Sequence, residues 1–233
     1  MLPLKDNVPT RHFPVLTVGL IAANVLVWIL YQDAGQGRGF LASVNELAYH
    51  PCEVENSCEQ VGRDWPVTIL TSMFMHASWG HLIGNMLFLW IFGNNVEDTL
   101  GRLRFVAFYL IGGLAATAAQ SFVTLGYGTA EDATVPNLGA SGAISAVLGA
   151  YFLLVPHAKV LTLVPPFFFL EIPASIFLGI YFVFQLIIGG YSFVHPEESG
   201  GVAYFAHLGG IGFGLLTVRL FAAGRPRPLR PSY

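Results

Sequence analysis

The stretch Ala206-His207-Leu208-Gly209-Gly210-Ile211-Gly212-Phe213-Gly214 opens one apolar segment of this chain, and Gly139-Ala140-Ser141-Gly142 opens another. Each stretch places one reactive side chain, His207 or Ser141, at the first turn of a predicted hydrophobic helix. A serine hydroxyl becomes a nucleophile when a neighbouring base accepts its proton. The two stretches therefore predict a serine–histidine pair, provided that the fold brings the two helix starts together.

The composition predicts a membrane protein. Of the 233 residues 54% are hydrophobic and 11% are charged, with a mean hydropathy of +0.61, whereas soluble domains carry about 25% charged residues. Apolar runs of about 20 residues can cross a bilayer. We expect an all-α polytopic bundle that forms a single domain over residues 1–233. Its six transmembrane helices are predicted at about 13–31, 79–95, 105–123, 141–155, 172–194 and 204–222.

The distribution of charge predicts how the helices are oriented. Nine of the eleven Lys and Arg residues lie in the two termini and in the second and fourth loops, or at their edges, whereas Arg38 and Arg63 lie in the first loop. Basic residues collect on the cytoplasmic side of membrane proteins. We therefore expect both termini in the cytoplasm and an active site that opens to the extracytoplasmic side.

This orientation brings polar residues together at the outer ends of three helices. His81 and Asn85 begin the second, Ser141 the fourth and His207 the sixth. Helix N-termini carry unpaired N–H groups and a positive dipole end, which would stabilise a developing oxyanion. The fourth helix, about 15 residues or roughly 22 Å long, is too short to span, so Ser141 should lie below the surface in a small wet cavity.

Small residues predict close packing of the serine and histidine helices. Glycines at four-residue spacing let helix backbones approach each other in membranes. Close approach is what a Ser–His hydrogen bond requires. The predicted packing glycines are Gly139, Gly142, Gly210 and Gly214.

The combined motifs resemble those of the rhomboid family of intramembrane serine proteases. His81-Leu-Ile-Gly-Asn85 resembles the family's H-x-x-x-N, Gly139-Ala-Ser141-Gly142 its G-x-S-G, and the stretch from Ala206 to Gly214 its A-H-x-x-G-x-x-x-G. Glu97, followed by Gly101 and Arg102, resembles the family's turn after the second helix.

The resemblance implies that Ser141 is the nucleophile and His207 the general base. It also implies that His81, Asn85 and the Ser141 backbone N–H form the oxyanion hole. Near the outer starts of these helices the sequence has no carboxylate, so we expect a Ser–His dyad rather than a triad. Ser145 lies where related rhomboids often have an aromatic ring that stacks beneath the histidine.

The family further implies hydrolysis of a peptide bond in or near the transmembrane segment of single-pass membrane-protein substrates. It suggests that the fifth helix and the loop at 195–201 yield to admit the substrate. The expected partners are these substrates and the lipid bilayer. We expect no binding of nucleic acid, and the sequence leaves the oligomeric state open. We expect no cofactor and no metal ion, and the bacterial plasma membrane as the location.

Other interpretations of the same residues stay open. Cys52 and Cys58, both in the first loop, could form a disulfide in an oxidising compartment, and a metal site with His50 is the less favoured alternative. The alternative function is a catalytically silent rhomboid-like protein that binds transmembrane clients. Such a protein would usually lack the serine or the histidine. A transporter would favour charged or inverted repeated segments, which the sequence lacks. His76, five residues before His81, is expected to make a structural hydrogen bond.

Overall fold

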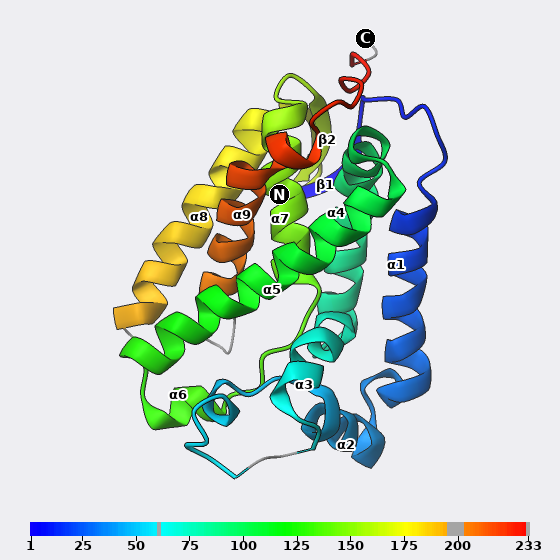
Figure 1. Ribbon diagram of the computed structural model, residues 1–233. Helices are drawn as coiled ribbons and strands as arrows, with labels where there is room; N and C mark the ends of the chain where they lie inside the picture. The colour runs from blue at the N-terminus through cyan, green and yellow to red at the C-terminus, as the bar shows by residue number, and fades with distance from the viewer. Residues whose placement is uncertain (60–61, 195–202, 232–233) are drawn as a thin grey trace.

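The apolar segments of the sequence form long helices in a computed structural model, which describes residues 1–59, 62–194 and 203–231 (Figure 1). The helices pack side by side as a bundle, as the fold class predicts. By length and composition, three helices within the described residues could cross a membrane, namely α5, α8 and α9. The principal helices are α1 (Val15–Leu26), α4 (Trp79–Leu100), α5 (Arg102–Tyr127), α7 (Ser141–Leu154), α8 (Ala174–Val194) and α9 (Tyr204–Phe221).

The junction between α4 and α5 is much tighter than the sequence suggested. Helix was predicted to stop at 95 and to resume at 105, but the only residue between the two helices is Gly101, with a φ of +77°. Glycine adopts this left-handed conformation without a steric penalty. The charged residues of the junction are helical because they have partners. Glu97 accepts hydrogen bonds from the backbone N–H groups of Leu16 and Thr17, at 3.0 and 2.7 Å, and so caps α1.

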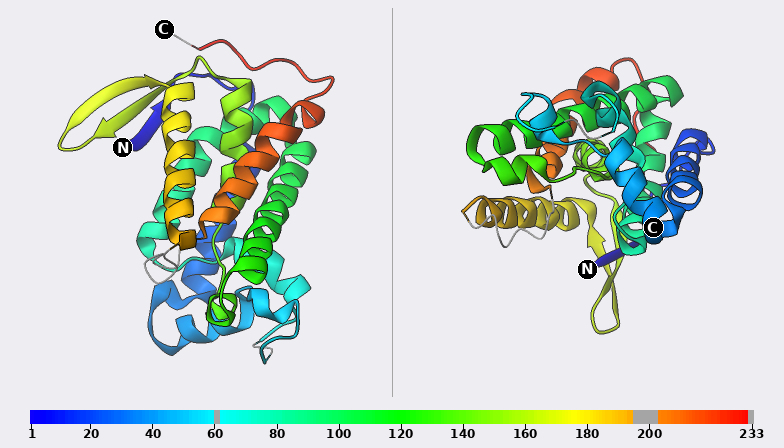
Figure 2. Two further views of the ribbon diagram at one scale, coloured as in Figure 1. Left: turned by 90° about the vertical axis from the view of Figure 1, so that its left-hand side faces the viewer. Right: turned by 90° about the horizontal axis from the view of Figure 1, so that it is seen from below.

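A small antiparallel sheet, which the sequence analysis does not predict, accompanies the helical bundle. It consists of β1 (Leu2–Asp6), β2 (Lys159–Val164) and β3 (Phe168–Pro173), in the order β1-β2-β3. Val160 and Thr162 of β2 are fully buried, two residues apart as a strand requires. The helix predicted from 172 therefore begins at Ala174, because the preceding residues belong to β3. Figure 2 shows the β2–β3 hairpin projecting to the side of the bundle.

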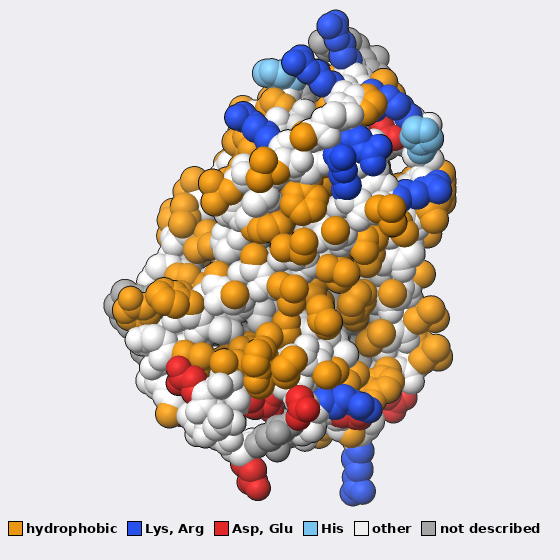
Figure 3. All heavy atoms as spheres, in the orientation of Figure 1, with side chains coloured by type: hydrophobic (Ala, Val, Ile, Leu, Met, Phe, Trp, Pro, Cys, Tyr) orange, Lys and Arg blue, Asp and Glu red, His pale blue; other side chains and the backbone are white. Residues whose placement is uncertain are grey.

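The two ends of the bundle differ in charge. Figure 3 shows apolar side chains across the middle, with Lys and Arg gathered where the C-terminal segment lies. We call this the basic end; it carries the sheet. The opposite, loop end holds α2 (Gly37–Leu47), α3 (Trp65–Thr71) and α6 (Ala130–Thr134), together with single helical turns at Pro51–Glu53 and Ser72–Phe74.

Helix α7 lies at the centre of the bundle and packs against α9, α5 and α4. Every residue from Gly142 to Tyr151 is buried. Two of the predicted packing glycines explain how α9 approaches so closely. A Cβ atom on Gly210 would collide with the Gly142 carbonyl oxygen, and one on Gly214 with the Ala146 carbonyl oxygen. The absence of side chains at these positions lets the two backbones touch.

Candidate active site

Ser141 and His207 lie at the loop-end starts of α7 and α9, directly opposite each other. The Ser141 Oγ and His207 Nε2 atoms are 2.8 Å apart, which is hydrogen-bond distance. Both residues are partly buried. The pair forms because α9 rests on α7 through Gly210, less than one turn beyond His207. The structure thus brings together the two residues that the sequence singled out.

The other ring nitrogen of His207 contacts a residue that sequence reasoning missed. Gln185 of α8 places its Oε1 atom 2.9 Å from His207 Nδ1, and the Gln185 side chain is buried. The sequence suggests that this helix yields to admit a substrate, but it assigns none of the helix's residues to the site. The available signal was the amide itself, because polar residues inside apolar helices usually face a partner.

His81, at the first turn of α4, faces the loop that leads to Ser141. Its backbone N–H donates to Ser78 Oγ at 3.1 Å, and its Nδ1 atom accepts from the Ala77 N–H at 3.4 Å. Because Nδ1 accepts, the ring proton resides on Nε2. That nitrogen lies 2.9 Å from the position that a Cβ atom on Gly139 would occupy. An N–H donor is therefore held beside the serine loop.

Asn85 follows His81 by one turn of α4, with its side chain buried. Its Nδ2 atom has no hydrogen-bond partner within the described part of the chain. Buried donors without a partner are rare in folded proteins. The Asn85 amide is therefore a buried donor close to His81 that could donate a hydrogen bond to an oxyanion.

Gly139 is not a helix-packing glycine, contrary to the sequence prediction. It lies in the loop before α7 with a φ of +129°, and its N–H donates to the Ser72 carbonyl at 2.9 Å. Two residues earlier, Asn137 pairs with Tyr49 through backbone hydrogen bonds of 2.7 and 3.2 Å. This loop is therefore fastened to the first-loop segments, and Gly139 leaves space for the His81 ring.

Ser145, where related proteins often have an aromatic ring, faces α9. A Cβ atom on Gly210 would come within 3.0 Å of the Ser145 Cβ atom, so no ring would fit between the two helices there. Among the described residues, one aromatic ring contacts His207, and it belongs to Tyr204. Its centroid is 6.4 Å away and the rings meet edge to face. No ring lies flat beneath the imidazole in the described structure, and the Nδ1 atom of the imidazole contacts the Gln185 amide.

His76 packs beside the site without making the hydrogen bond expected from the sequence. Its ring lies edge to face with that of His81 at a centroid distance of 5.0 Å, and neither of its ring nitrogens has a partner in the described residues. Gln32 instead holds the His76 backbone through two hydrogen bonds of 2.8 Å. Burial lowers the pKa of His76 to about 3, so the ring is neutral. It supports His81 by packing.

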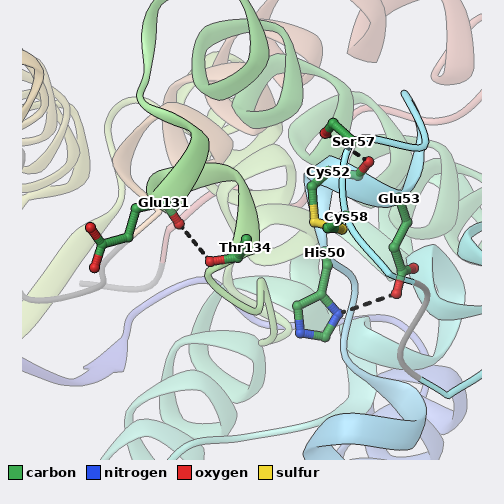
Figure 4. Close-up of a disulfide and its surroundings, with 7 residues drawn as sticks. All are labelled: His50, Cys52, Glu53, Ser57, Cys58, Glu131 and Thr134. Atoms are coloured by element: carbon green, nitrogen blue, oxygen red, sulfur yellow. Dashed lines mark hydrogen bonds and ion pairs between the residues drawn. A yellow bond between two sulfur atoms is a disulfide. The ribbon is translucent and has the colours of Figure 1, made fainter.

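The disulfide predicted as possible lies in the first loop. Cys52 and Cys58 are bonded, and Ser57 Oγ donates to the Cys52 carbonyl at 3.2 Å (Figure 4). The turn that contains Cys52 contacts α6. His50 is buried beside Glu53, with 3.7 Å between its Nδ1 and the Glu53 Oε1. The disulfide thus lies among the loop-end segments, beside α6. The loop at 195–201, which is predicted to yield to the substrate, lies outside the described residues.

Similarity to known proteins identifies the family of this chain. Residues 63–224 match the family model described as Rhomboid domain. The chain is 32% identical over 173 residues to "Presenilin-associated rhomboid-like protein A, mitochondrial" of Danio rerio, covering 69% of this chain and 44% of the relative. It is 34% identical over 152 residues to "Rhomboid protein 1, mitochondrial" of Saccharomyces cerevisiae, covering 64% and 40%.

A third relative extends the match almost to the full chain. "RHOMBOID-like protein 12, mitochondrial" of Arabidopsis thaliana is 29% identical over 225 residues, which cover 91% of this chain and 60% of the relative. The chain thus spans 40% to 60% of the length of these three relatives. The matched region contains the helices that carry Ser141, His207, His81 and Asn85. The chain belongs to the rhomboid family.

Proposed function

We propose that this protein is an intramembrane serine endopeptidase that acts through a Ser141–His207 dyad. The observation that carries the proposal is the 2.8 Å separation between Ser141 Oγ and His207 Nε2. This geometry suits proton transfer from the hydroxyl to the imidazole as the oxygen attacks a carbonyl carbon. Substrates would be single-pass membrane proteins, cut in or near their transmembrane segment.

The neighbouring donors fit the remaining steps. As Ser141 Oγ bonds to the scissile carbonyl carbon, the carbonyl oxygen becomes an anion, which the N–H groups of His81 Nε2, Asn85 Nδ2 and the Ser141 backbone would stabilise. His207 then returns the proton to the amine, and the C–N bond breaks. A water molecule, deprotonated by His207, hydrolyses the acyl-enzyme and restores the serine hydroxyl.

We also propose the orientation and the compartment. The concentration of Lys and Arg at the basic end favours placing both termini on the cytoplasmic side and the Ser–His pair toward the opposite side. A disulfide at the loop end fits an oxidising compartment there. A bacterial plasma membrane satisfies both conditions. The three relatives carry "mitochondrial" in their names. In right-side-out vesicles a membrane-impermeant thiol reagent should modify a cysteine introduced at the loop end and not one introduced at the basic end, and the reverse pattern would overturn this orientation.

Labelling by a fluorescent fluorophosphonate tests the dyad directly. The purified wild type in mild detergent should label, whereas Ser141→Ala and His207→Ala should not. Ser145→Ala, a buried serine one turn further along the same helix, is the matched control and should label like the wild type. If folded wild type stays unlabelled while a known active intramembrane serine protease labels in parallel, the proposal fails in favour of a silent client-binding protein.

A further inference from the structure

We propose that Gln185 is a positioning residue that holds His207 in the tautomer able to accept the Ser141 proton. This inference rests on the proposed function and adds a residue from a third helix to the dyad. The carboxylate that orients histidine in a triad is absent from the described site, and an uncharged amide occupies the corresponding place. The site is therefore a Ser–His–Gln arrangement built from α7, α9 and α8.

The hydrogen bonds determine where the imidazole proton resides. The Gln185 Oε1 atom can only accept, so His207 Nδ1, 2.9 Å away, must carry the proton. The other nitrogen, Nε2, then has its lone pair free to accept from the Ser141 hydroxyl at 2.8 Å. Without the amide, the opposite tautomer would place a proton on Nε2, where the serine proton has to go.

The placement of Gln185 on α8 supports this role. Its side chain is only 6% exposed, whereas Phe184 and Leu186 on either side are 56% and 59% exposed and face outward. Gln185 is therefore directed into the bundle. Burying an amide in an apolar helix is unfavourable unless it finds a hydrogen-bond partner. A neutral amide also avoids placing a permanent charge at membrane depth, which a carboxylate would do.

The test measures the rate constant of fluorophosphonate labelling as a function of pH for Gln185→Leu, Gln185→Glu and the control Leu186→Ala. Gln185→Leu should label about 10- to 100-fold more slowly, a smaller loss than the roughly 10⁴-fold seen when a triad loses its charged orienting group. Gln185→Glu should retain most of the rate, with its acidic limb at higher pH, because a carboxylate favours the protonated imidazole. Leu186→Ala should behave like the wild type.

The outcomes separate the two proposals. A wild type that does not label overturns the protease itself. A labelling wild type with a Gln185→Leu variant of equal rate and equal pH profile overturns the positioning role. If Gln185→Leu does not fold, Gln185→Asn decides, because its shorter amide no longer reaches His207 Nδ1, and a purely structural amide would leave the rate and the pH profile unchanged.

A second inference concerns the β2–β3 hairpin and does not depend on catalysis. Its end carries the run Phe167, Phe168, Phe169 and Leu170, whose side chains are 84%, 62%, 62% and 49% exposed. Contiguous exposed apolar side chains usually mark an interaction surface. The hairpin is regular β-structure rather than an irregular loop, since all six β2 residues pair with β3.

The position of the hairpin identifies the partner as lipid. Figure 2 shows it extending sideways at the end of the bundle where α8 begins. The adjoining turns of α8 also expose apolar side chains, with Ile176 54% and Ile180 48% exposed, so the apolar surface of the bundle continues onto the hairpin. The ion pair between Lys159 and Glu171, at 3.2 Å, lies at the base of the hairpin. We infer that the hairpin inserts its aromatic end into the membrane leaflet at the basic end, beside α8.

Site-directed spin labelling tests this inference in phosphatidylcholine–phosphatidylglycerol vesicles. The described residues contain no free cysteine, so an introduced cysteine gives one labelling site there. A nitroxide on Phe168→Cys should collide more often with oxygen, which concentrates in lipid, than with the water-soluble relaxation agent NiEDDA. On the control Glu171→Cys the preference should be reversed. NiEDDA access at 168 equal to that at 171, or line broadening at 168 that increases with protein density, would overturn lipid insertion, the latter in favour of contact with a second copy.

Discussion

The ring of His81 lies directly over Gly139, so that a Cβ atom there would come within 2.8 Å of His81 Cε1 and 2.9 Å of Nε2. We predict that Gly139→Ala slows fluorophosphonate labelling at least about tenfold. The methyl group would displace an oxyanion donor, and one such donor is worth about 10² to 10³ in rate. The φ of +129° adds strain for any residue with a side chain.

Gly84→Ala is the matched control for that substitution. Gly84 lies in α4, and no atom comes within 4 Å of the position that a Cβ atom would occupy there. Alanine is the better helix former by roughly 1 kcal/mol. Labelling should be unchanged and the melting temperature equal or higher. A Gly139→Ala variant that labelled as fast as Gly84→Ala would contradict the assigned contact with His81.

Removal of the Asn85 amide should slow the reaction without disturbing the fold. Its Nδ2 atom has no partner in the described structure, so Asn85→Ala breaks no hydrogen bond made by that atom. We expect labelling to fall by about 10² to 10³ while the melting temperature changes little. Ile83→Ala, on the exposed side of the same helix, should label normally. Asn85→Ala that labelled equally fast would exclude Asn85 from the oxyanion hole.

The glycines of α9 should differ sharply in their tolerance of alanine. Gly214→Ala would drive a methyl group into the Ala146 carbonyl, whereas Gly212 has nothing within 4 Å of its Cβ position. We expect Gly214→Ala to lower the stability by about 1 to 3 kcal/mol, as over-packing does, and to reduce labelling by separating Ser141 from His207. Gly212→Ala should be neutral in both. Thermal unfolding in detergent, measured alongside labelling, would show whether the two variants diverge in this way.

Asp6 should make the stability of the protein depend on pH. Burial raises the pKa of Asp6 to about 6, although the Tyr151 hydroxyl, 2.6 Å from its Oδ2, and nearby Lys5 favour the charged form. The folded state therefore binds this proton more tightly than the unfolded state, so stability decreases as pH rises from about 4 to about 6.

Asp6→Asn should remove this dependence. The Asn oxygen can still accept from Tyr151 and from Asn95, whose Nδ2 lies 2.7 Å from the Asp6 Oδ2. We expect the variant to be more stable than the wild type at pH 7.5 by about 1 to 3 kcal/mol and to show a flatter profile between pH 4 and 6. Melting temperatures across that range would decide, and equal slopes for the two proteins would contradict the assignment.

Much of the bundle could be predicted because apolar length and glycine spacing are local properties of the sequence. The pairing of Ser141 with His207 followed from motif, orientation and small residues together. Gln185 was missed because one amide among apolar residues gives no indication of its direction until α8 is placed beside α9. The hairpin was missed because the segment between the fourth and fifth predicted helices was interpreted as a loop, and only its last two residues, Ile172 and Pro173, as the start of the next helix.

Helix ends are harder to predict from the sequence, because charged residues next to an apolar segment usually indicate a loop. Glu97 and Asp98 are helical, and their charges are compensated by α1 and by Arg11, which lies 3.2 Å from the Asp98 carboxylate. Such compensation comes from residues 80 or more positions away, so the local sequence does not reveal it. The same applies to β1, whose strand partner is β2.

That pairing has a consequence for biosynthesis. Leu2 pairs with Leu163, so the first strand of the chain has no partner until the ribosome has made α1, α4, α5 and α7. Contacts this distant in sequence form late, because the intervening chain must first be ordered. The N-terminal strand therefore has no β2 to pair with while four of the principal helices are made, and the sheet can be completed only after the helix that carries Ser141 has been synthesised.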